Sequence, residues 1–378
     1  MSSRVTRKRA RMDEGDAAAV KAELQQLEGS MDVDAAPPLD PEAPRSDASG
    51  TRANDAASDA DEDAQAYVQD EELWFHDGTA ILVAAGVGFR IYKGLLAEHS
   101  PVFQELFSQS HPLRTLPIDE TQTVTCPVIQ LSDSAHDLRY ILRICMPRRG
   151  ASVYGAYNPP FDEVSASIRL GQKYQITPLY EQSIRLLKGH YTDDLSVWLT
   201  RKPKTLPGFQ AVNVIGVVNL ARLTGELSIL PTALYKCTRL DSRVVRGFQH
   251  ADGSQENLTL DDLGLVFDAK TAIRKASIAV MLRTFNGGVA EGCRRPDTCS
   301  AVLYDAMADL DEHVDQLIRG AAFQSYTGVL KDKQLAVCTA CKEAVNLRHS
   351  EEQQIMWDHL PELLRIQVPG WGAGKSLP

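Results

Sequence analysis

The stretch from residue 71 to residue 107, EELWFHDGTAILVAAGVGFRIYKGLLAEHSPVFQELF, decides the fold because strand-like sequence runs directly into helix-like sequence. An apolar run from Leu73 to Phe75 ends at Asp77-Gly78, and a second run from Ile81 to Ala84 ends near two glycines. Short apolar runs between turn residues are typical of β-strands joined by tight turns. We therefore predict short strands at the start of this stretch.

The second half of the same stretch has the pattern of helices. Ser100 can cap the free amides at the start of a helix, and proline is tolerated at the first helical position. A new helix is therefore predicted to begin at Pro101. Apolar residues around it recur at spacings of three and four, which is the period of one buried helical face: Leu95, Leu96, Val102, Phe103, Leu106 and Phe107.

The next eighty residues alternate between predicted irregular segments and predicted regular elements. Residues 108–125 are polar and contain two prolines, so we predict a loop there. Residues 127–133 are predicted to form a strand, and Ser132 or Asp133 can cap the helix that follows. That helix should end at Pro147, and residues 148–160 should be irregular before a further helix begins at Phe161. The capped helix presents four apolar residues at helical spacing: Leu138, Ile141, Leu142 and Cys145.

Four pieces of the chain, in the right order, resemble the BTB (also called POZ) domain. They are the short strands with Phe89-Arg90-Ile91, the S-P-V-F-x-E-L-F helix from Ser100, the strand ending L-S-D before a helix, and LGQKYQI at residues 170–176. Tyr92 stands where the family usually has histidine, and Met146-Pro147 replaces a usual tyrosine and glycine. The resemblance covers residues 70–190 and implies an α+β fold in which a small sheet is wrapped by helices.

The first 66 residues differ in composition from the rest. The whole chain of 378 residues is 43% apolar and 24% charged, which is ordinary for a globular protein. Residues 1–66 contain no Phe, Trp or Tyr and carry 15 acidic and 8 basic residues, so we predict a disordered acidic tail. Its net charge of −7, out of −10 for the chain, leaves −3 for residues 67–378, which does not favour direct nucleic-acid binding.

A cluster of basic residues near the beginning of the chain suggests where in the cell the protein is found. Arg7, Lys8, Arg9 and Arg11 resemble a basic nuclear-import signal, for which an extended, exposed segment is suitable. The alternative interpretation is a solvated basic end that no receptor reads. We expect a nuclear protein, or otherwise a cytoplasmic one, since the chain has no signal peptide and its apolar runs are too short to cross a membrane.

The second half of the chain is predicted to be mostly α-helical. Residues 191–209 have the composition of a connector, and residues 210–370 contain helical patterns such as Val212 to Leu223 and Gln353 to Leu364. No period of 20 to 50 residues repeats, which excludes kelch and ankyrin arrays. The segments VVNLARLTGELSILPTALY and IMWDHLPELL of this half, together with its cysteine pairs, resemble a fungal-type subset of BTB proteins. In that subset the helical C-terminal region has no assigned activity.

Four of the seven cysteines form two spaced pairs. Cys293 and Cys299 are separated by five residues, and Cys338 and Cys341 by two. Four thiolates can surround a structural zinc ion tetrahedrally, and C-x-x-C is a common half-site. Two alternatives remain open, namely that the pairs are small buried groups on a helix face and beside a loop, or that they are redox partners. No other cofactor motif and no ordered set of catalytic residues is found.

The resemblance implies a protein that binds other proteins and is not an enzyme. BTB domains pair two chains, so we expect a homodimer, with Leu73, Trp74 and Phe75 as candidates for the contact. The alternative is that Trp74 and Phe75 pack in the core of their own chain. A scaffold that recruits a protein partner in transcription or chromatin-related regulation is the leading interpretation. The other is a substrate adaptor of a cullin-based ubiquitin ligase, because Ile118 and Glu120 match the hydrophobic-x-Glu pattern that some BTB proteins use to bind a cullin.

Overall fold

The computed structural model describes residues 67–147, 158–312, 323, 325–326 and 336–372. Residues Gln65–Pro378 form one compact unit, which combines a small mixed sheet with many helices. The predicted α+β class is therefore correct. The predictions for residues 1–66, including the disordered tail and the basic cluster at Arg7 to Arg11, lie outside the described residues, as does most of the segment 148–160.

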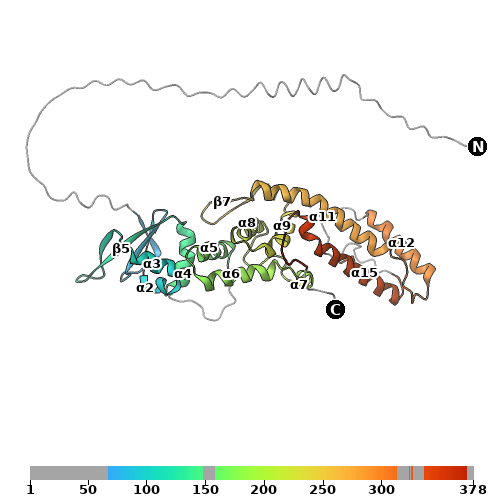
Figure 1. The fold of residues 1–378 in the computed structure, drawn as a ribbon, viewed down its shortest axis with the longest axis horizontal. Coiled ribbons are helices and arrows are strands. Elements are labelled where there is room, and N and C mark those ends of the chain that lie inside the picture. Colours follow the sequence, from blue (N-terminus) through green and yellow to red (C-terminus); the bar gives the residue numbers. More distant parts are fainter. Residues whose placement is uncertain (1–66, 148–157, 313–322, 324, 327–335, 373–378) are drawn as a thin grey trace, which may run out of the picture. The chain divides into compact units, whose positions relative to one another are not determined.

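A five-stranded sheet begins the described chain (Figure 1). Strands β2 and β3 form an antiparallel hairpin whose turn residues Ala85 and Gly86 both have positive φ angles, of 46° and 77°. β2 also pairs in parallel with β5, and β1 pairs in parallel with β3. The order across the sheet is β1-β3-β2-β5-β4. The strands are β1 (Val68–Trp74), β2 (Ala80–Ala84), β3 (Val87–Ile91), β4 (Leu113–Pro117) and β5 (Thr123–Leu131).

The predicted loop at residues 108–125 is wrong, because most of this segment belongs to the antiparallel β4–β5 hairpin. Its turn is held by Asp119, whose carboxylate accepts hydrogen bonds from the backbone N–H groups of Thr121 at 2.8 Å and Gln122 at 2.9 Å. Two prolines suggested a loop, but Pro117 lies in the edge strand β4, where a missing donor is tolerated. The threonines that looked like loop residues favour strands when they face solvent.

Five helices follow or flank the sheet: α2 (Lys93–His99), α3 (Pro101–Ser108), α4 (Ala135–Cys145), α5 (Phe161–Lys173) and α6 (Thr177–His190). The predicted start of α3 is confirmed, since the Ser100 hydroxyl accepts a hydrogen bond from the backbone N–H of Phe103 at 3.0 Å. The same hydroxyl donates to the carbonyl oxygen of Tyr174 at the end of α5. One side chain therefore caps α3 and attaches it to α5.

The predicted cap of α4 is wrong. Ser134, and not Ser132 or Asp133, accepts hydrogen bonds from the first free amides of α4. Asp133 instead accepts a hydrogen bond from the Tyr174 hydroxyl and pairs with Lys173 at 2.6 Å. The aspartate is thus engaged by the end of α5, which leaves the next polar residue to cap α4.

The first core lies between one face of the sheet and these helices. Leu82, Phe89 and Ile91 point from the strands toward Phe103 of α3 and Leu138 of α4, and all five are fully buried. The Phe103 ring stacks on the Tyr174 ring with centroids 4.2 Å apart. Each such side chain stabilises the fold by about 2 kcal/mol through burial of apolar surface.

The C-terminal half is helical, as predicted, apart from a small hairpin of β6 (Phe248–Gln249) and β7 (Gln255–Glu256). Short 3-10 turns at Ala211–Asn213 and Leu227–Ile229 precede two of its helices. The helices are α7 (Leu195–Thr200), α8 (Val214–Thr224), α9 (Leu230–Cys237), α10 (Arg243–Arg246), α11 (Leu260–Asn286), α12 (Pro296–Glu312), α15 (Thr339–Asp358) and α16 (Leu360–Leu363).

The predicted connector at residues 191–209 is wrong because it contains α7, which packs into the second core. Asp194 caps α7 by accepting from the backbone N–H of Ser196 at 2.8 Å. Leu195 and Trp198, three residues apart, are buried on one face of the helix. The Trp198 ring contacts the Trp357 ring of α15, with centroids 5.6 Å apart.

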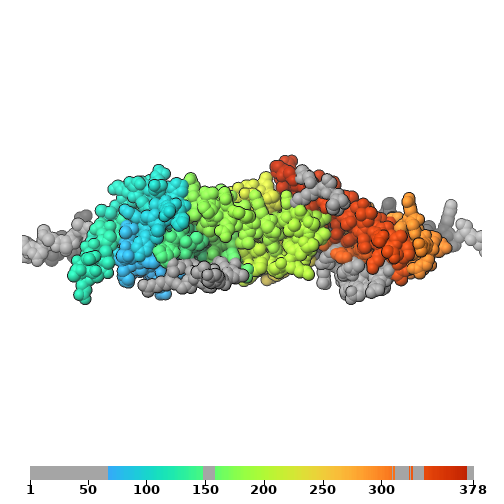
Figure 2. Space-filling view, turned by 90° about the horizontal axis from the view of Figure 1, so that it is seen from below, coloured from blue at the N-terminus to red at the C-terminus, as the bar shows by residue number. Residues whose placement is uncertain are grey.

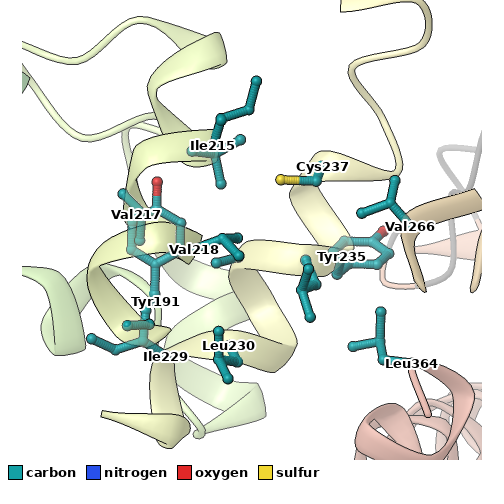
Figure 3. Close-up of a cluster of buried hydrophobic side chains, with 14 of the residues drawn as sticks. Tyr191, Ile215, Val217, Val218, Ile229, Leu230, Tyr235, Cys237, Val266 and Leu364 are labelled. Carbon is teal, nitrogen blue, oxygen red and sulfur yellow. The ribbon is translucent and has the colours of Figure 1, made fainter. Parts of the chain in front are cut away.

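The second core joins both predicted domains. Phe161 and Ile168 of α5 and Ile184 of α6, all within the predicted BTB region, pack in one cluster with residues of α8, α9 and α11. Figure 3 shows part of this cluster, where Tyr191, Val218, Leu230 and Tyr235 converge from successive segments. In the space-filling view the α5–α6 region (green) adjoins both the blue sheet region and the helices that follow it (Figure 2).

An ionic network also holds the β6–β7 hairpin to α5. His250 donates or accepts at both ring nitrogens, with Nδ1 2.7 Å from Asp162 of α5 and Nε2 2.7 Å from Glu256 of β7. Arg169 of α5 pairs with the same Glu256 at 3.1 Å. Burial alone would lower the pKa of His250, but the hydrogen bonds with the two carboxylates raise it above its ordinary value of 6.5.

The double role of Ser100 can be tested by replacing it with alanine. Ser100→Ala removes the cap of α3 and leaves the buried Tyr174 carbonyl without its donor, so the free energy of unfolding should fall by about 2 kcal/mol. Urea denaturation of the full chain measures this loss. Ser108→Ala, which removes an exposed hydroxyl of the same helix, is the control and should change stability by less than about 0.5 kcal/mol. Equal effects of the two substitutions would contradict the assignment.

The His250 network should make stability depend on pH in a predictable direction. Because the pKa of His250 is raised by folding, its contribution is complete below pH 6.5 and is lost as the pH rises through the raised pKa. We expect His250→Gln to cost about 1 kcal/mol more at pH 6 than at pH 8.5 in urea titrations. His76→Gln, at an exposed turn position, is the control. A cost that does not change with pH would show that His250 acts only through packing.

Candidate metal centre

A small third core lies between the end of α11, α12 and α15. Met281 and Phe285 of α11, Leu303 of α12 and Val345 of α15 are buried against one another. With Ala306, Leu310 and Tyr326 the cluster has only seven buried members among the described residues. So few apolar contacts provide limited stability, and small units of this kind commonly depend on a metal ion or disulfides.

The four cysteines of the two predicted pairs lie together beside this core. Their Sγ atoms are all within 4.8 Å of one another. The Cys338 and Cys293 sulfurs are 3.7 Å apart. In a tetrahedral zinc site with Zn–S bonds of about 2.3 Å, neighbouring sulfurs are about 3.8 Å apart. The set therefore has the ligand type, number and spacing that a tetrahedral zinc ion requires.

Local structure explains how residues so far apart in the sequence meet. Cys293 ends a turn in which its N–H donates to the carbonyl of Ala290 at 2.9 Å. Cys299 lies in the first turn of α12, Cys338 occupies the N-cap position of α15, and Cys341 lies in the first turn of α15. The site thus joins the N-terminal ends of two helices, where the positive end of the helix dipole favours thiolates.

Backbone amides supply hydrogen bonds to the sulfurs. The N–H of Ala290 donates to the Cys341 sulfur and the N–H of Cys338 donates to the Cys299 sulfur, both at 3.4 Å. A hydrogen bond from the backbone of Cys341 lowers the pKa of the Cys338 thiol to about 6. Such donors orient metal ligands and stabilise the deprotonated form. The sequence pattern predicted the four ligands but not Ala290, since a backbone donor leaves no signature in residue type.

The two alternative interpretations of the cysteines can be compared with this geometry. Cys338 occupies the N-cap position before α15, without a side-chain capping hydrogen bond, so the two cysteines are not both helical residues. Cys299 and Cys341 are buried, whereas Cys293 and Cys338 are partly exposed. Four cysteines that served only as small apolar core residues would all be buried. All seven cysteines are free thiols in the structure.

The candidate dimer residues all contact their own chain. Leu73 is 4% exposed and belongs to the first core. Trp74 and Phe75 are partly buried, with the Phe75 ring 4.9 Å from that of Tyr92 and the Trp74 ring 6.1 Å from that of Tyr67. Leu73 has almost no surface left for a partner, while the two aromatic residues and the nearby Val68, which is 73% exposed, retain some.

The candidate cullin residues lie in the turn between β4 and β5. Ile118 is partly buried, and its N–H donates to the carbonyl of Gln122 at 2.8 Å. Glu120 is exposed at the tip of the turn. The two residues are therefore presented by a folded hairpin and not by the open loop that the sequence suggested.

No family model matches the chain, and no curated protein has a matching sequence. Among the described residues, none of the helices combines the length and the apolar character that a bilayer span requires.

Proposed function

We propose that this protein is an interaction scaffold that forms a homodimer through its sheet-containing region and recruits a protein partner. The support is the architecture of residues 68–190, in which the short strands, the Ser100-capped helix and the LGQKYQI segment assemble into a small sheet wrapped by helices. This is the arrangement that the resemblance to BTB domains implies. The partner belongs, in this proposal, to transcription or chromatin-related regulation.

Open sheet edges are the feature that most favours a binding role. β1 and β4 each pair with one strand only among the described residues, so each has one side without a strand partner, although the N–H groups of Glu72 and Leu73 on β1 donate to the Asp70 carboxylate. Each also carries an exposed apolar side chain, Val68 at 73% and Leu113 at 70% exposure. An exposed edge of this kind is a template for pairing with another strand. We assign the homodimer contact to the β1 edge because the partly exposed Trp74 and Phe75 adjoin it.

We propose further that Cys293, Cys299, Cys338 and Cys341 hold a structural Zn²⁺ ion. The observation that carries this is the convergence of four sulfurs at tetrahedral spacing beside a small core. A four-thiolate site leaves no open position for a water or substrate, which is the pattern of structural and not catalytic zinc. The ion would tie α12 and α15 together where apolar contacts are few.

A cullin adaptor is the second candidate function. The β4–β5 turn presents Glu120 to solvent, which a docking contact needs. Co-purification of a cullin with the full chain, lost in Glu120→Lys and retained in Glu105→Lys on α3, would favour this role over the scaffold role.

The dimer assignment gives a prediction that compares the two sheet edges. Val68→Lys places like charges opposite one another across a two-fold axis at the β1 edge, so the dimer dissociation constant should rise about tenfold or more. Leu113→Lys makes the same change at the β4 edge and should leave the dimer intact. Light scattering of the full chain over a range of concentrations measures both. A protein that is monomeric throughout would refute the proposal, and equal weakening by the two substitutions would refute the β1 contact.

The zinc assignment is tested by metal analysis of the full chain purified without chelators. We expect one zinc per chain, and Cys341→Ser should lose it and destabilise the α12–α15 region by about 3 kcal/mol or more. Limited proteolysis should then cut within this region while the sheet region stays intact. Cys145→Ser changes a buried thiol outside the cluster and should keep the metal. Metal-free wild-type protein with only five titratable thiols would instead establish a redox pair.

A further inference from the structure

The structure contains a pocket in which all charged lining residues, among those that the structure describes, are basic. It lies where α7 and the residues after it meet α9 and the residues after α9, and it has a volume of about 350 Å³. Among its 14 lining residues, five are basic and none is acidic. The five are Arg201, Lys204, Lys236, Arg239 and Arg243. This concentration is unusual because residues 67–378 as a whole carry a net charge of −3, the remainder when the −7 of residues 1–66 is taken from −10.

The cations at the centre of the pocket are held in place by the fold. The guanidinium of Arg201 stacks on the buried Trp198 ring, 3.1 Å from its centroid, and donates to the Trp198 carbonyl. The Lys236 ammonium donates to the carbonyl of Lys204 and to Nε2 of His190, both at 2.8 Å. These contacts fix the direction of two positive groups, as in a preorganised binding site.

No carboxylate of the described residues pairs with these five cations. The Nε atom of Arg201 is buried and has no hydrogen-bond partner among the described residues. A buried donor without a partner costs free energy, so this arrangement is unfavourable unless an acceptor enters the pocket.

The burial of Lys236 and His190 adds to the free-energy cost of placing several positive charges together. Burial, followed by repulsion from Arg201, Lys204 and Arg239, lowers the pKa of Lys236 to about 7. Burial and the neighbouring Lys236 lower the pKa of His190 to about 3, so His190 is neutral and accepts the lysine's hydrogen bond. An anion in the pocket would offset these repulsions and keep Lys236 protonated.

The number of charges and the size of the pocket define the class of ligand. Five converging cations exceed what a single phosphate, with at most two negative charges, can neutralise. Arginine forks match phosphate oxygens in geometry, and a pocket of about 350 Å³ is at the small end of the range for small-molecule ligands. Arg239 and Arg243 are exposed at the rim, where they can attract an anion from solution.

We propose that this pocket binds a small molecule with two or more phosphate groups. Arg201 and Lys236 contact the phosphates inside the pocket, and Lys204, Arg239 and Arg243 contact them at its mouth. The aromatic side chains of Tyr191 and Tyr235 line the remaining wall. The inference is independent of the dimer and of the zinc site, and it gives the helical half a ligand of its own.

Calorimetric titration of the full chain with inorganic tripolyphosphate tests the proposal, with orthophosphate titrated in parallel. We expect tripolyphosphate to bind at least tenfold more tightly than orthophosphate and to bind less tightly as salt is raised. The double substitution Arg201→Gln with Lys236→Gln should weaken tripolyphosphate binding at least tenfold. A second pair, Arg239→Gln with Arg243→Gln, changes only exposed residues and should also weaken binding, so the proposal stays testable even if the first variant does not fold.

The matched control is Arg185→Gln with Lys275→Gln, which removes the same two charges from exposed positions outside the pocket. It should bind tripolyphosphate as the wild type does. Three results would overturn the proposal. They are the absence of tripolyphosphate binding to the wild-type chain, an equal loss of affinity in the control and pocket variants, and orthophosphate binding as tight as tripolyphosphate binding.

Discussion

The burial of α5 on two opposite sides is the constraint on which the rest of the structure depends. Leu170 and Tyr174 face the sheet core, whereas Phe161 and Ile168 face the core of the C-terminal helices. A helix in this position has only a narrow polar strip, which carries Asp162 and Arg169, and eight of its thirteen residues are buried. Close packing also demands a small residue at Gly171, where a Cβ atom would lie 3.3 Å from the side chain and backbone of Tyr180 on α6. The Ser100 hydroxyl then fixes α3 to the end of this same helix.

Local sequence signals predicted much of the fold because they act through neighbouring residues. The cap at Ser100, the start of α3 at Pro101 and the apolar faces of α4 depend on spacings of a few residues, and these elements are present. Other features depend on distant partners and were mispredicted. Asp133 does not cap α4 because Tyr174, 41 residues away, engages it. The β4–β5 hairpin and α7 were missed because threonines, prolines and charges resemble loop sequence when the packing partner is unknown.

The candidate sites show the same division. The cysteine spacing predicted four zinc ligands, and the fold brings the two pairs together across 38 intervening residues. The charged pocket left no comparable signature, since its five cations occupy positions 201, 204, 236, 239 and 243 in two segments that are distant in the sequence. Leu73 illustrates the opposite error, because an apolar run beside a turn does not reveal whether its side chains face inward or outward. The burial of Leu73 in the first core became visible only in the structure, where it lies in the irregular part of the β1–β3 pairing between Gln69 and Trp74.

The position of α5 and α6 has a thermodynamic consequence for the chain as a whole. Because the two helices contribute to both large cores, neither core can lose its order without removing the support of the other. The sheet and the helical half should therefore unfold together in one cooperative transition, as a single folding unit and not as independently folding domains. The third core is less directly coupled, since among the described residues it contains none from α5 or α6 and is joined to the second core through α11 and α15. It is therefore the region most able to open locally while the remainder stays native.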